Sequence, residues 1–592
     1  MEQATTALRD YFGYEVFREG QQKVIEKVLN GEDTVCIMPT GGGKSLCYQI
    51  PALVMEGVVI VISPLISLMK DQVDALTTAG IPAAYMNSTM TNEAYRETME
   101  KAIRGEYRLL YIAPERLDSD FFTNRLQLMN VSLVAIDEAH CISQWGHDFR
   151  PSYRLIRKMI SLFHKKPTLL ALTATATHAV RDDICEQLSI DPEATVLTGF
   201  ERENLTFSVV KGQDREKYII DYVQKNKAEA GIIYAATRKA VDQVHALLER
   251  KQISVEKYHA GLSDEERKMS QERFLNDEAK LMVATNAFGM GIDKSNIRYV
   301  LHYQMPKNIE SYYQEAGRAG RDGLASVCTL LFSSQDVQTQ RFLIDQSQDL
   351  SRVPMELEKL QAMVDYCHTE NCLQKHIVQY FGEADAKECG RCANCTDTRE
   401  QIDVTEDVQK VLSCVIRMGQ KFGKTMVAQV LAGSKNKKMK DFGFEKLTTY
   451  GILKGQSAKE IGSFIEFIIS ENYLGVGHGQ FPTIYVTEEG KTVLLGKQSV
   501  FRKASVETKQ ITKDDPLFES LRALRMDIAQ ESGVPPFVVF SDKTLQDMVN
   551  FRPTTEEAFL AISGVGRTKL ERYGEAFMKA IRDFKEEEIE IV

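Results

Sequence analysis

The sequence predicts an α/β protein with two doubly wound parallel-sheet lobes, followed by smaller and mainly helical units. Short β-branched runs alternate with helical stretches over residues 33–200, and the same rhythm restarts near Lys217. Such uninterrupted apolar runs are typical of parallel strands, because helices cover both faces of their sheet. The length of 592 residues also exceeds what one hydrophobic core supports, at roughly 150 residues per domain.

The strands expected in the first lobe are DTVCIM, VVIVIS, RLLYIAPE, LVAIDE, TLLALTATA and ATVLTGF. Those expected in the second are AGIIYAATR, ISVEKYHAG, KLMVATN, IRYVLHY and ASVCTLLF. The segment between the lobes, GFERENLTFSVV, is interpreted as a short connector. The predicted domains are lobes at 1–204 and 205–340, a helical cysteine-rich module at 341–403, a helix-rich unit closing with two strands at 404–495, a flexible linker at 496–514 and a helical unit at 515–592.

Composition and charge exclude several classes of protein. A content of 43% hydrophobic and 26% charged residues is that of an ordinary globular protein, which excludes a mostly disordered chain. The apolar run Val58–Ile62 ends at Ser63-Pro64, and the first residues lack a signal-peptide pattern, so we expect a cytoplasmic protein without membrane spans. The net charge of −10 argues against a surface that binds nucleic acid everywhere. A local basic channel remains compatible with it, because salt screens surface charge beyond about 8–10 Å.

A glycine-rich loop follows the first predicted strand, where residues 38–45 read MPTGGGKS. Consecutive glycines let backbone N–H groups turn toward phosphate oxygens, while the lysine contacts the β/γ-phosphates and the serine hydroxyl ligates Mg²⁺. Met38 stands where the generic pattern has glycine. The residues expected to hold ATP and Mg²⁺ here are Thr40, Gly41, Gly42, Gly43, Lys44 and Ser45.

Two carboxylates end the predicted strand LVAIDE. Asp137 and Glu138 are followed by Ala139 and His140, and a buried strand rarely ends in unpaired charge. Asp137 suits a second Mg²⁺ anchor, and Glu138 suits the base that orients an attacking water. A solvated strand end is the alternative, but the phosphate loop in the same lobe favours an ATP hydrolase.

Further motifs carry a resemblance to a known family. TATA at 173–176 and QEAGRAGRDG at 314–323 follow PTGGGKS and DEAH in an order that resembles superfamily 2 helicases. HCISQWGHDFRPSY at 140–153 and the N-terminal LRDYFGYEVFREGQ are similar to signatures of the RecQ family of DNA helicases in its bacterial form. The resemblance covers nearly the whole chain. It implies two RecA-like lobes, a zinc-binding domain, a winged helix and an HRDC domain.

The same resemblance implies roles in nucleotide binding. Tyr14, Arg18 and Gln21 would hold adenine, because glutamine offers a donor and an acceptor while tyrosine and arginine stack. Without the family, this stretch would be a plain helix start. Arg318 and Arg321 would face the cleft between the lobes, where an arginine finger reaches the γ-phosphate.

The loop after DEAH is expected to bind single-stranded DNA. Exposed aromatic side chains beside arginine form a stacking platform for bases, worth about 1–3 kcal/mol per base. A small hydrophobic cluster under the loop is the alternative. Because the loop begins at the carboxylates, we also expect it to couple DNA binding to hydrolysis. Its candidate DNA-binding residues are Trp145, His147, Phe149 and Arg150.

Four cysteines predict a structural metal site. Cys372, Cys389, Cys392 and Cys395 provide four soft ligands, which suit tetrahedral Zn²⁺. An iron–sulfur cluster is the rival interpretation. Cys367 competes for the first position, and the family pattern favours Cys372.

The last two modules are expected to contact DNA. Exposed lysines of a winged helix suit phosphate contacts, although a solvated helix face explains each one equally well. These lysines are Lys421, Lys424, Lys435, Lys437 and Lys438. The wing tip at 478–481 would wedge at the base-pair junction, and in the HRDC-like unit Lys569 and Tyr573 would contact a strand. An ordinary helix-to-helix turn is the alternative there.

The leading prediction is an ATP-dependent DNA helicase that uses Mg²⁺ and Zn²⁺. The resemblance implies 3′ to 5′ movement on single-stranded DNA and unwinding of duplex or branched DNA in recombination, repair, replication-fork maintenance and the SOS response. It also implies a nucleoid-associated location, with single-strand-binding protein and recombination or repair proteins as partners. An RNA helicase and a nucleotide-switched DNA scaffold are the alternatives.

Overall fold

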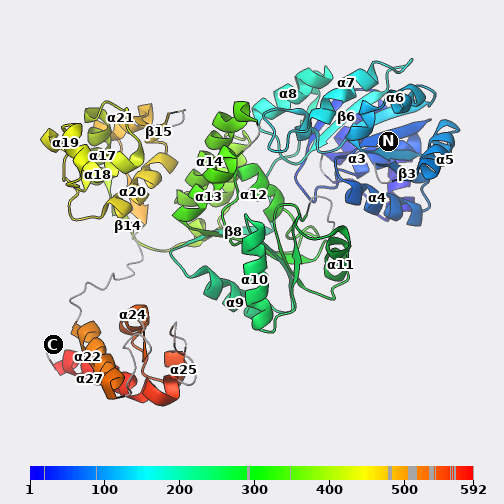
Figure 1. Ribbon diagram of the computed structural model, residues 1–592. Coiled ribbons are helices and arrows are strands. Elements are labelled where there is room, and N and C mark those ends of the chain that lie inside the picture. The colour runs from blue at the N-terminus through cyan, green and yellow to red at the C-terminus, as the bar shows by residue number, and fades with distance from the viewer. Residues whose placement is uncertain are drawn as a thin grey trace. The chain divides into compact units, whose positions relative to one another are not determined.

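The computed structural model describes residues 1–18, 20–87, 90–289, 294–346, 349–477, 483–503, 516–531, 539–540, 542–560, 562, 565 and 569–590 (Figure 1). The chain divides into two compact units, Met1–Arg502 and Lys503–Val592. The first unit contains both lobes, the cysteine-rich module and the winged helix.

Lobe 1 is a parallel sheet in the order β3-β4-β2-β5-β6-β1-β7. Its strands are β1 Thr34–Ile37, β2 Val58–Ile62, β3 Ala83–Met86, β4 Leu109–Ile112, β5 Val131–Ile136, β6 Thr168–Thr173 and β7 Thr195–Leu197. All six strands predicted for this lobe are confirmed. β3 was not predicted, because this half-exposed edge strand has the sequence AAYM, which lacks β-branched residues.

Helices cover both faces of this sheet. Val59 and Val61 of β2 face α2–α4, while Ile60 and Ile62 belong to the cluster on the other face with α5–α8. This alternation follows from the two-residue period of a strand. The helices are α1 Glu2–Phe12, α2 Gln21–Leu29, α3 Leu46–Val54, α4 Ile66–Thr78, α5 Asn92–Ile103, α6 Asp120–Leu126, α7 Leu155–Ile160 and α8 His178–Leu188.

Lobe 2 is a second parallel sheet, in the order β10-β11-β9-β12-β13-β8. Its strands are β8 Leu205–Lys211, β9 Ala230–Tyr234, β10 Glu256–Tyr258, β11 Leu281–Ala284, β12 Ile297–His302 and β13 Ser326–Phe332. The five predicted strands are confirmed. The predicted connector GFERENLTFSVV is wrong in its second half, because Leu205 and Phe207 are buried and β8 pairs with β13 along its whole length.

Helices α9 Arg215–Lys225 and α10 Arg238–Arg250 cover one face of lobe 2, as their apolar side chains pack in one cluster with β9, β11 and β12. Helices α11 Asp264–Leu275 and α12 Ile309–Ala316 contribute to the core on the other face. That core continues into α13 Ser334–Asp345 and α14 Val353–His368, and then into α15 Leu373–Tyr380 and α16 Ala393–Thr396 of the cysteine-rich module.

The winged-helix module has its own core and packs through α20 against α14. Its elements are β14 Gln401–Asp403, α17 Thr405–Arg417, α18 Lys424–Leu431, α19 Lys437–Asp441, α20 Ala458–Ser470, β15 Leu474–Val476, β16 Ile484–Val486, α21 Glu488–Leu494 and β17 Phe501–Lys503. The start of the predicted linker is wrong. Val500 is buried in this core and β17 pairs with β14, so residues 496–502 belong to the module.

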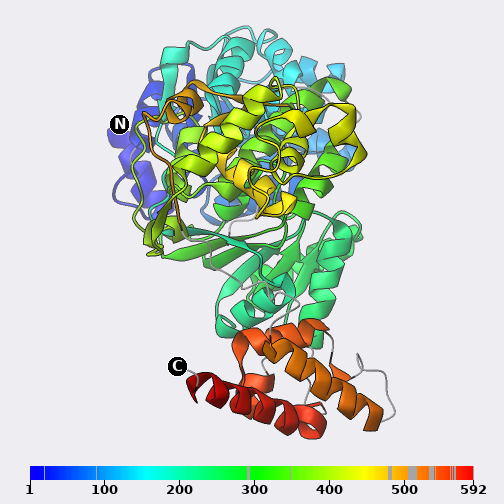
Figure 2. The same cartoon turned by 90° about the vertical axis from the view of Figure 1, so that its left-hand side faces the viewer.

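The C-terminal unit is helical in its described residues (Figure 1, Figure 2). It contains α22 Pro516–Glu531, α24 Asp542–Phe551, α25 Glu556–Leu560, a π-helical turn at Leu570–Gly574 and α27 Glu575–Glu590. Phe540, Phe559 and Phe577 pack together at its centre.

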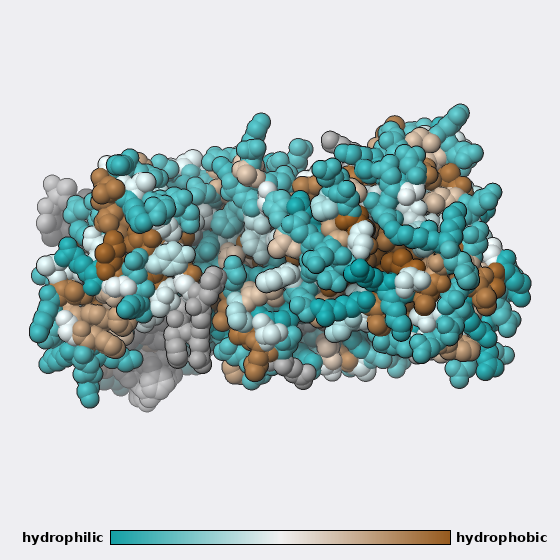
Figure 3. Space-filling model, turned by 90° about the horizontal axis from the view of Figure 1, so that it is seen from above, coloured by the Kyte–Doolittle hydropathy of each residue, from teal (hydrophilic) through white to brown (hydrophobic). Residues whose placement is uncertain are grey.

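Apolar side chains on the face drawn in Figure 3 gather in separate patches among hydrophilic ones. In the part of the chain that the structure describes, we find no helix with the length and apolar character needed to cross a membrane.

We predict that a methyl group at Gly231 destabilises lobe 2. Gly231 of β9 lies opposite Tyr299 of β12, and a Cβ atom there would approach the buried tyrosine ring to 2.1 Å. Overpacking of this kind costs about 1–3 kcal/mol. Urea denaturation of Gly231→Ala should therefore show a lower free energy of unfolding. The same change in a Tyr299→Leu background should cost less, and an equal cost in both backgrounds would contradict the steric explanation.

Candidate active site

The glycine-rich loop leaves β1 at the edge of the sheet where β5 and β6 also end. Ile37, the last residue of β1, pairs with Thr173 of β6, and Ile136, the last of β5, pairs with Ala171. The carboxyl ends of parallel strands therefore bring the loop, the DEAH motif and the TATA motif together. This edge of an open α/β sheet is where ligands bind.

Left-handed backbone shapes the loop. Gly41 and Gly43 have φ values of 83° and 80°, a region that favours glycine. Gln21 Nε2 donates hydrogen bonds to the carbonyls of Gly42 and Gly43 at 3.0 and 3.1 Å, and its Oε1 accepts from Arg18 N at 2.8 Å. The Gln21 amide is thus committed to bracing the loop. The Arg18 guanidinium donates to the carbonyl of Gly41.

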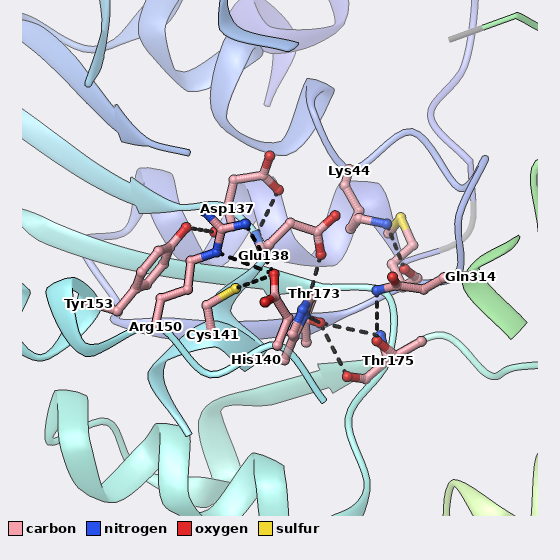
Figure 4. Close-up of polar contacts among 12 residues, drawn as sticks. Lys44, Asp137, Glu138, His140, Cys141, Arg150, Tyr153, Thr173, Thr175 and Gln314 are labelled. Atoms are coloured by element: carbon pink, nitrogen blue, oxygen red, sulfur yellow. Dashed lines mark hydrogen bonds and ion pairs between the residues drawn. The ribbon is translucent and has the colours of Figure 1, made fainter. Parts of the chain in front are cut away.

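The loop lysine and the two carboxylates form a group of charges that lines the cavity between the lobes (Figure 4), and Asp137 is the buried member. Burial lowers the pKa of Lys44, against the opposing effect of Glu138 and Asp137. Burial, and then the neighbouring Glu138, raise the pKa of Asp137 to about 7. Both shifts show that these charges are poorly solvated, so a ligand that brings complementary charge would gain from binding here.

Glu138 has unusual backbone geometry for a residue with a side chain. Its φ of 48° and ψ of 48° lie in the left-handed region, and such conformations cluster at functional sites. Its Oε2 atom is buried and has no hydrogen bond within the described part of the chain, although His140 Nδ1 lies 3.3 Å away.

A polar relay runs from this carboxylate toward lobe 2. His140 Nδ1 lies 2.9 Å from Thr173 Oγ1, which accepts from Thr175 N at 3.2 Å. Gln314 Nε2 of lobe 2 donates to Thr175 Oγ1 at 3.0 Å. Figure 4 shows these side chains side by side, so the DEAH, TATA and QEAGRAGRDG motifs are in contact.

One cavity of about 770 Å³ collects most of the predicted nucleotide-binding residues from both lobes. Its predicted lining residues are Tyr14, Arg18, Gln21, Thr40, Gly41, Gly43, Lys44, Ser45, Asp137, Glu138 and Arg321. Gly42 does not line it, and a Cβ there would meet Met38 at 2.5 Å. Arg318 does not line it either. Its buried guanidinium donates to the carbonyl of Gly289 within lobe 2.

The aromatic loop lies between lobe 1 and α14. Lys359 Nζ donates to the Trp145 carbonyl at 2.6 Å, and Arg352 donates to the Gly146 carbonyl at 2.7 Å. The Trp145 side chain is 54% exposed. It is therefore available to a ligand, as the stacking interpretation requires.

The other predicted DNA-binding residues of this loop are engaged within the protein. His147 stacks on His140 with ring centroids 4.2 Å apart, and burial lowers its pKa well below the usual range. Phe149 lies near the guanidinium of Arg352, 5.6 Å from the ring centroid. Arg150 is paired with Asp148 at 3.2 Å and donates to the Pro64 carbonyl at 3.1 Å.

The four predicted metal ligands come together. The Sγ atoms of Cys372, Cys389, Cys392 and Cys395 all lie within 4.8 Å of one another. Cys372 and Cys392 are 3.9 Å apart, close to the 3.8 Å or so that a tetrahedron of roughly 2.3 Å Zn–S bonds requires. Cys367 is buried outside the group. The donor set fits one Zn²⁺ ion better than an iron–sulfur cluster, whose cysteines ligate different iron atoms.

The candidate DNA-binding lysines of the winged helix differ in their exposure. Lys421, Lys435, Lys437 and Lys438 are exposed. Lys424 forms an ion pair with the buried Glu466, so it is not a free surface charge. The wing tip at 478–481 lies outside the described residues.

In the C-terminal unit, two candidates pack onto the core. Lys569 Nζ lies 5.5 Å from the centroid of the Phe540 ring, and Tyr573 meets the same ring edge-on at 6.1 Å. Both side chains therefore contribute to the packing of this unit, whether or not they also contact DNA.

Comparison with protein families matches five models in order. They are a DEAD/DEAH box helicase (residues 18–183), a helicase conserved C-terminal domain (214–323), a RecQ zinc-binding domain (334–396), an RQC domain (398–510) and an HRDC domain (514–581). The chain is 58% identical over 585 residues to the ATP-dependent DNA helicase RecQ of Bacillus subtilis (strain 168), with 99% of each chain covered.

This chain belongs to the RecQ family of helicases. Its identity to the ATP-dependent DNA helicase RecQ of Pasteurella multocida (strain Pm70) is 41%, covering 98% of this chain and 94% of the relative. A putative ATP-dependent RNA helicase of Acanthamoeba polyphaga mimivirus is 36% identical, over 82% of this chain and 91% of its own. The RecQ resemblance expected from the motifs is thus confirmed.

One residue that contacts this site was not predicted from the sequence. Arg202, on the connector between the lobes, donates to the Thr40 carbonyl in the glycine-rich loop at 2.7 Å. It lies in a polar stretch without a motif, so only the tertiary contact reveals it.

We predict that the cysteine group holds about one zinc ion per chain. Cys389→Ser should lose most of the bound zinc and lower the stability of the cysteine-rich module, because removing one thiolate opens the tetrahedron. Cys367→Ser is the matched control and should keep its zinc. The metal released by acid, titrated with a colorimetric chelator, measures both. Full zinc content in Cys389→Ser, or loss in Cys367→Ser, would contradict this ligand set.

Proposed function

We propose that this RecQ-family chain, which is an ATP-dependent DNA helicase, hydrolyses ATP between its two lobes and moves 3′ to 5′ along single-stranded DNA. The observation that carries the proposal is the shared cavity. Lys44, Asp137 and Glu138 of lobe 1 line it together with Arg321 of lobe 2. A triphosphate bound there would touch both lobes, so binding and hydrolysis would close and release them.

The residues present fit ATP with Mg²⁺. Ser45 and Asp137 both line the cavity and offer the hydroxyl and carboxylate oxygens that Mg²⁺ prefers. The raised pKa of Asp137 reflects burial beside Glu138, which a divalent cation would offset. Bound Mg²⁺ would neutralise charge on the phosphates. Tyr14 and Arg18 line the same cavity and would stack on the base.

Hydrolysis would use three charged side chains of this chain. Lys44 would contact the β- and γ-phosphates, and Arg321 would stabilise charge on the γ-phosphate as an arginine finger. Glu138, which lines the cavity, would orient the attacking water with its carboxylate. Arg318, which is bonded to Gly289, would support lobe 2 rather than touch the nucleotide.

DNA would reach this chemistry through the aromatic loop. Trp145 offers an exposed face for base stacking, and the stacked pair of His147 and His140 continues to Glu138. A DNA strand bound to Trp145 would shift the side chains that contact Glu138, and so would change how the Glu138 carboxylate orients the attacking water. We propose that this continuous set of contacts couples DNA binding to hydrolysis.

The remaining modules would position the DNA substrate. Zinc held by the four cysteines would stabilise the cysteine-rich module, and the exposed lysines of the winged helix would contact duplex phosphates. Single-strand-binding protein and recombination or repair proteins are the proposed partners, and we propose a cytoplasmic, nucleoid-associated location. Branched DNA in recombination, repair and replication-fork maintenance is the proposed substrate.

Hydrolysis measured without nucleic acid, with single-stranded DNA and with RNA of the same sequence tests the function. We expect stimulation by DNA well above that by RNA. Equal stimulation would favour an RNA helicase, and indifference to both would favour a nucleotide-switched scaffold.

Glu138→Gln should reduce DNA-stimulated ATP hydrolysis by about 10²–10⁴-fold, because an amide cannot accept the water proton. Binding of a fluorescent ATP analogue should persist, since the amide keeps the size of the side chain. The matched control is Glu193→Gln, which changes an exposed glutamate on the surface turn Pro192–Ala194 of lobe 1 and should leave hydrolysis unchanged. Retained hydrolysis in Glu138→Gln would reject the proposed base.

Trp145→Ala should lower the ratio of hydrolysis with DNA to hydrolysis without it, because loss of stacking removes about 1–3 kcal/mol per base. Trp145→Phe should keep most of that ratio. Steady-state hydrolysis over a range of DNA concentrations provides the measurement. An unchanged ratio in Trp145→Ala would mean that the exposed indole does not sense DNA.

A further inference from the structure

Arg202 joins the two lobes through its guanidinium group. One nitrogen donates to the Thr40 carbonyl of lobe 1 at 2.7 Å and to the Gly317 carbonyl of lobe 2 at 3.2 Å. The other donates to the carbonyls of Ala319 and Gly320 at 3.1 and 3.3 Å. A single side chain therefore holds main-chain atoms of the glycine-rich loop and of the GRAGR segment.

The environment of this side chain is unfavourable for a charge. Arg202 is 9% exposed, and its four hydrogen bonds in the described part of the chain all go to neutral main-chain carbonyls. Burying a guanidinium without a carboxylate partner carries a desolvation penalty. The planar fork of arginine offsets part of it by satisfying several carbonyls at once, which the single ammonium of lysine cannot do.

The acceptors of Arg202 flank the groups that would act on ATP. Thr40 lies four residues before Lys44, and the lobe 2 carbonyls lie between residues 317 and 320, directly before Arg321. Arg202 does not itself line the nucleotide cavity, whereas Thr40 and Arg321 do. Any effect on hydrolysis would therefore pass through the backbone that carries those residues.

The cysteine-rich module contacts the main chain of the connector at Arg202. Arg391, between the ligand candidates Cys389 and Cys392, donates to the carbonyls of Arg202 and Leu205 at 3.1 and 3.4 Å. The stacked rings of Phe200 and Phe381, with centroids 4.4 Å apart, fix the connector against the same module. The connector is thus held in place before it reaches the two lobes.

We propose that Arg202 is a positioning residue for ATP hydrolysis, which sets Arg321 against the glycine-rich loop when the lobes are closed. This inference rests on the proposed function. Arg391 and the cysteine-rich module provide the fixed support from which Arg202 reaches both lobes.

Single-turnover ATP hydrolysis with saturating single-stranded DNA tests the proposal in the full-length protein. Arg202→Lys should lower the rate by about 10–100-fold, as expected when a catalytic group is displaced by about 1 Å. The affinity for a fluorescent ATP analogue should change far less. In an Arg321→Ala background the same change should lower the rate by less than about threefold, because residues that act as a unit are not additive.

Asn204→Ala is the matched control. Asn204 lies on the same connector and donates to the carbonyls of Gly320 and Leu324, both in lobe 2. It should leave the rate within about twofold of wild type, since it makes no contact with the glycine-rich loop. Urea denaturation of each variant identifies any loss of folding, and Arg202→Gln, which keeps a planar donor, should recover part of the rate.

Three results would overturn the inference: an Arg202→Lys rate close to wild type, an equal loss in the Arg321→Ala background, or an equal loss in Asn204→Ala. A wild-type protein without DNA-stimulated hydrolysis would instead reject the proposed function, and this inference with it. Loss in Arg202→Lys alone, with a normal urea midpoint, would support the positioning role.

Discussion

The charges gathered in the interlobe cavity impose the main constraint on this fold. Asp137 and Glu138 directly follow β5, and Lys44 lies in the glycine-rich loop beside them. Burial lowers the pKa of Lys44 and raises that of Asp137 to about 7. Holding these charged groups in one fixed arrangement requires rigid support. The glutamine that braces the loop, the left-handed backbone at Glu138 and the relay through Thr173 all provide it.

A site made from two lobes also needs a fixed way to bring the second lobe to the first. The connector between the lobes provides this link through one apolar side chain, Phe200, and one charged side chain, Arg202. Phe200 packs its ring against Phe381 of the cysteine-rich module, and Tyr313 of lobe 2 donates to the Phe200 carbonyl at 2.7 Å. Arg202 then reaches backbone of both lobes. The cysteine-rich module therefore contacts the same connector from which Arg202 reaches both lobes.

The aromatic loop is held in the same manner, by contacts from outside its own lobe. Lys359 of α14 and Arg352, the residue directly before that helix, donate hydrogen bonds to its main chain and leave the indole of Trp145 exposed. The main chain of the loop is therefore held by hydrogen bonds, while the side chain of Trp145 is exposed. That arrangement suits a sensor, because a ligand on the exposed ring would act on a structure tied to Glu138 through His147 and His140.

Much of this could be predicted from the sequence, because the relevant signals are local. Strand composition, the spacing of PTGGGKS and DEAH, and the CGRCANC cluster identified both lobes, the phosphate loop and the metal site. A strand of β-branched residues or a turn of glycines is determined by neighbours in the chain. β3 was missed because its sequence AAYM lacks β-branched residues, and β8 was read as a connector because its pairing with β13 is a tertiary contact.

Only the tertiary structure decided which of several similar residues do a given task. Arg318 and Arg321 are three residues apart, yet the turn between them buries one in lobe 2 and turns the other to the cavity. Lys424 is indistinguishable in sequence from exposed lysines until Glu466 pairs with it. Arg202 carries no motif, because its acceptors lie more than a hundred residues apart along the chain. Partners at such separations are fixed by packing, and no local pattern encodes them.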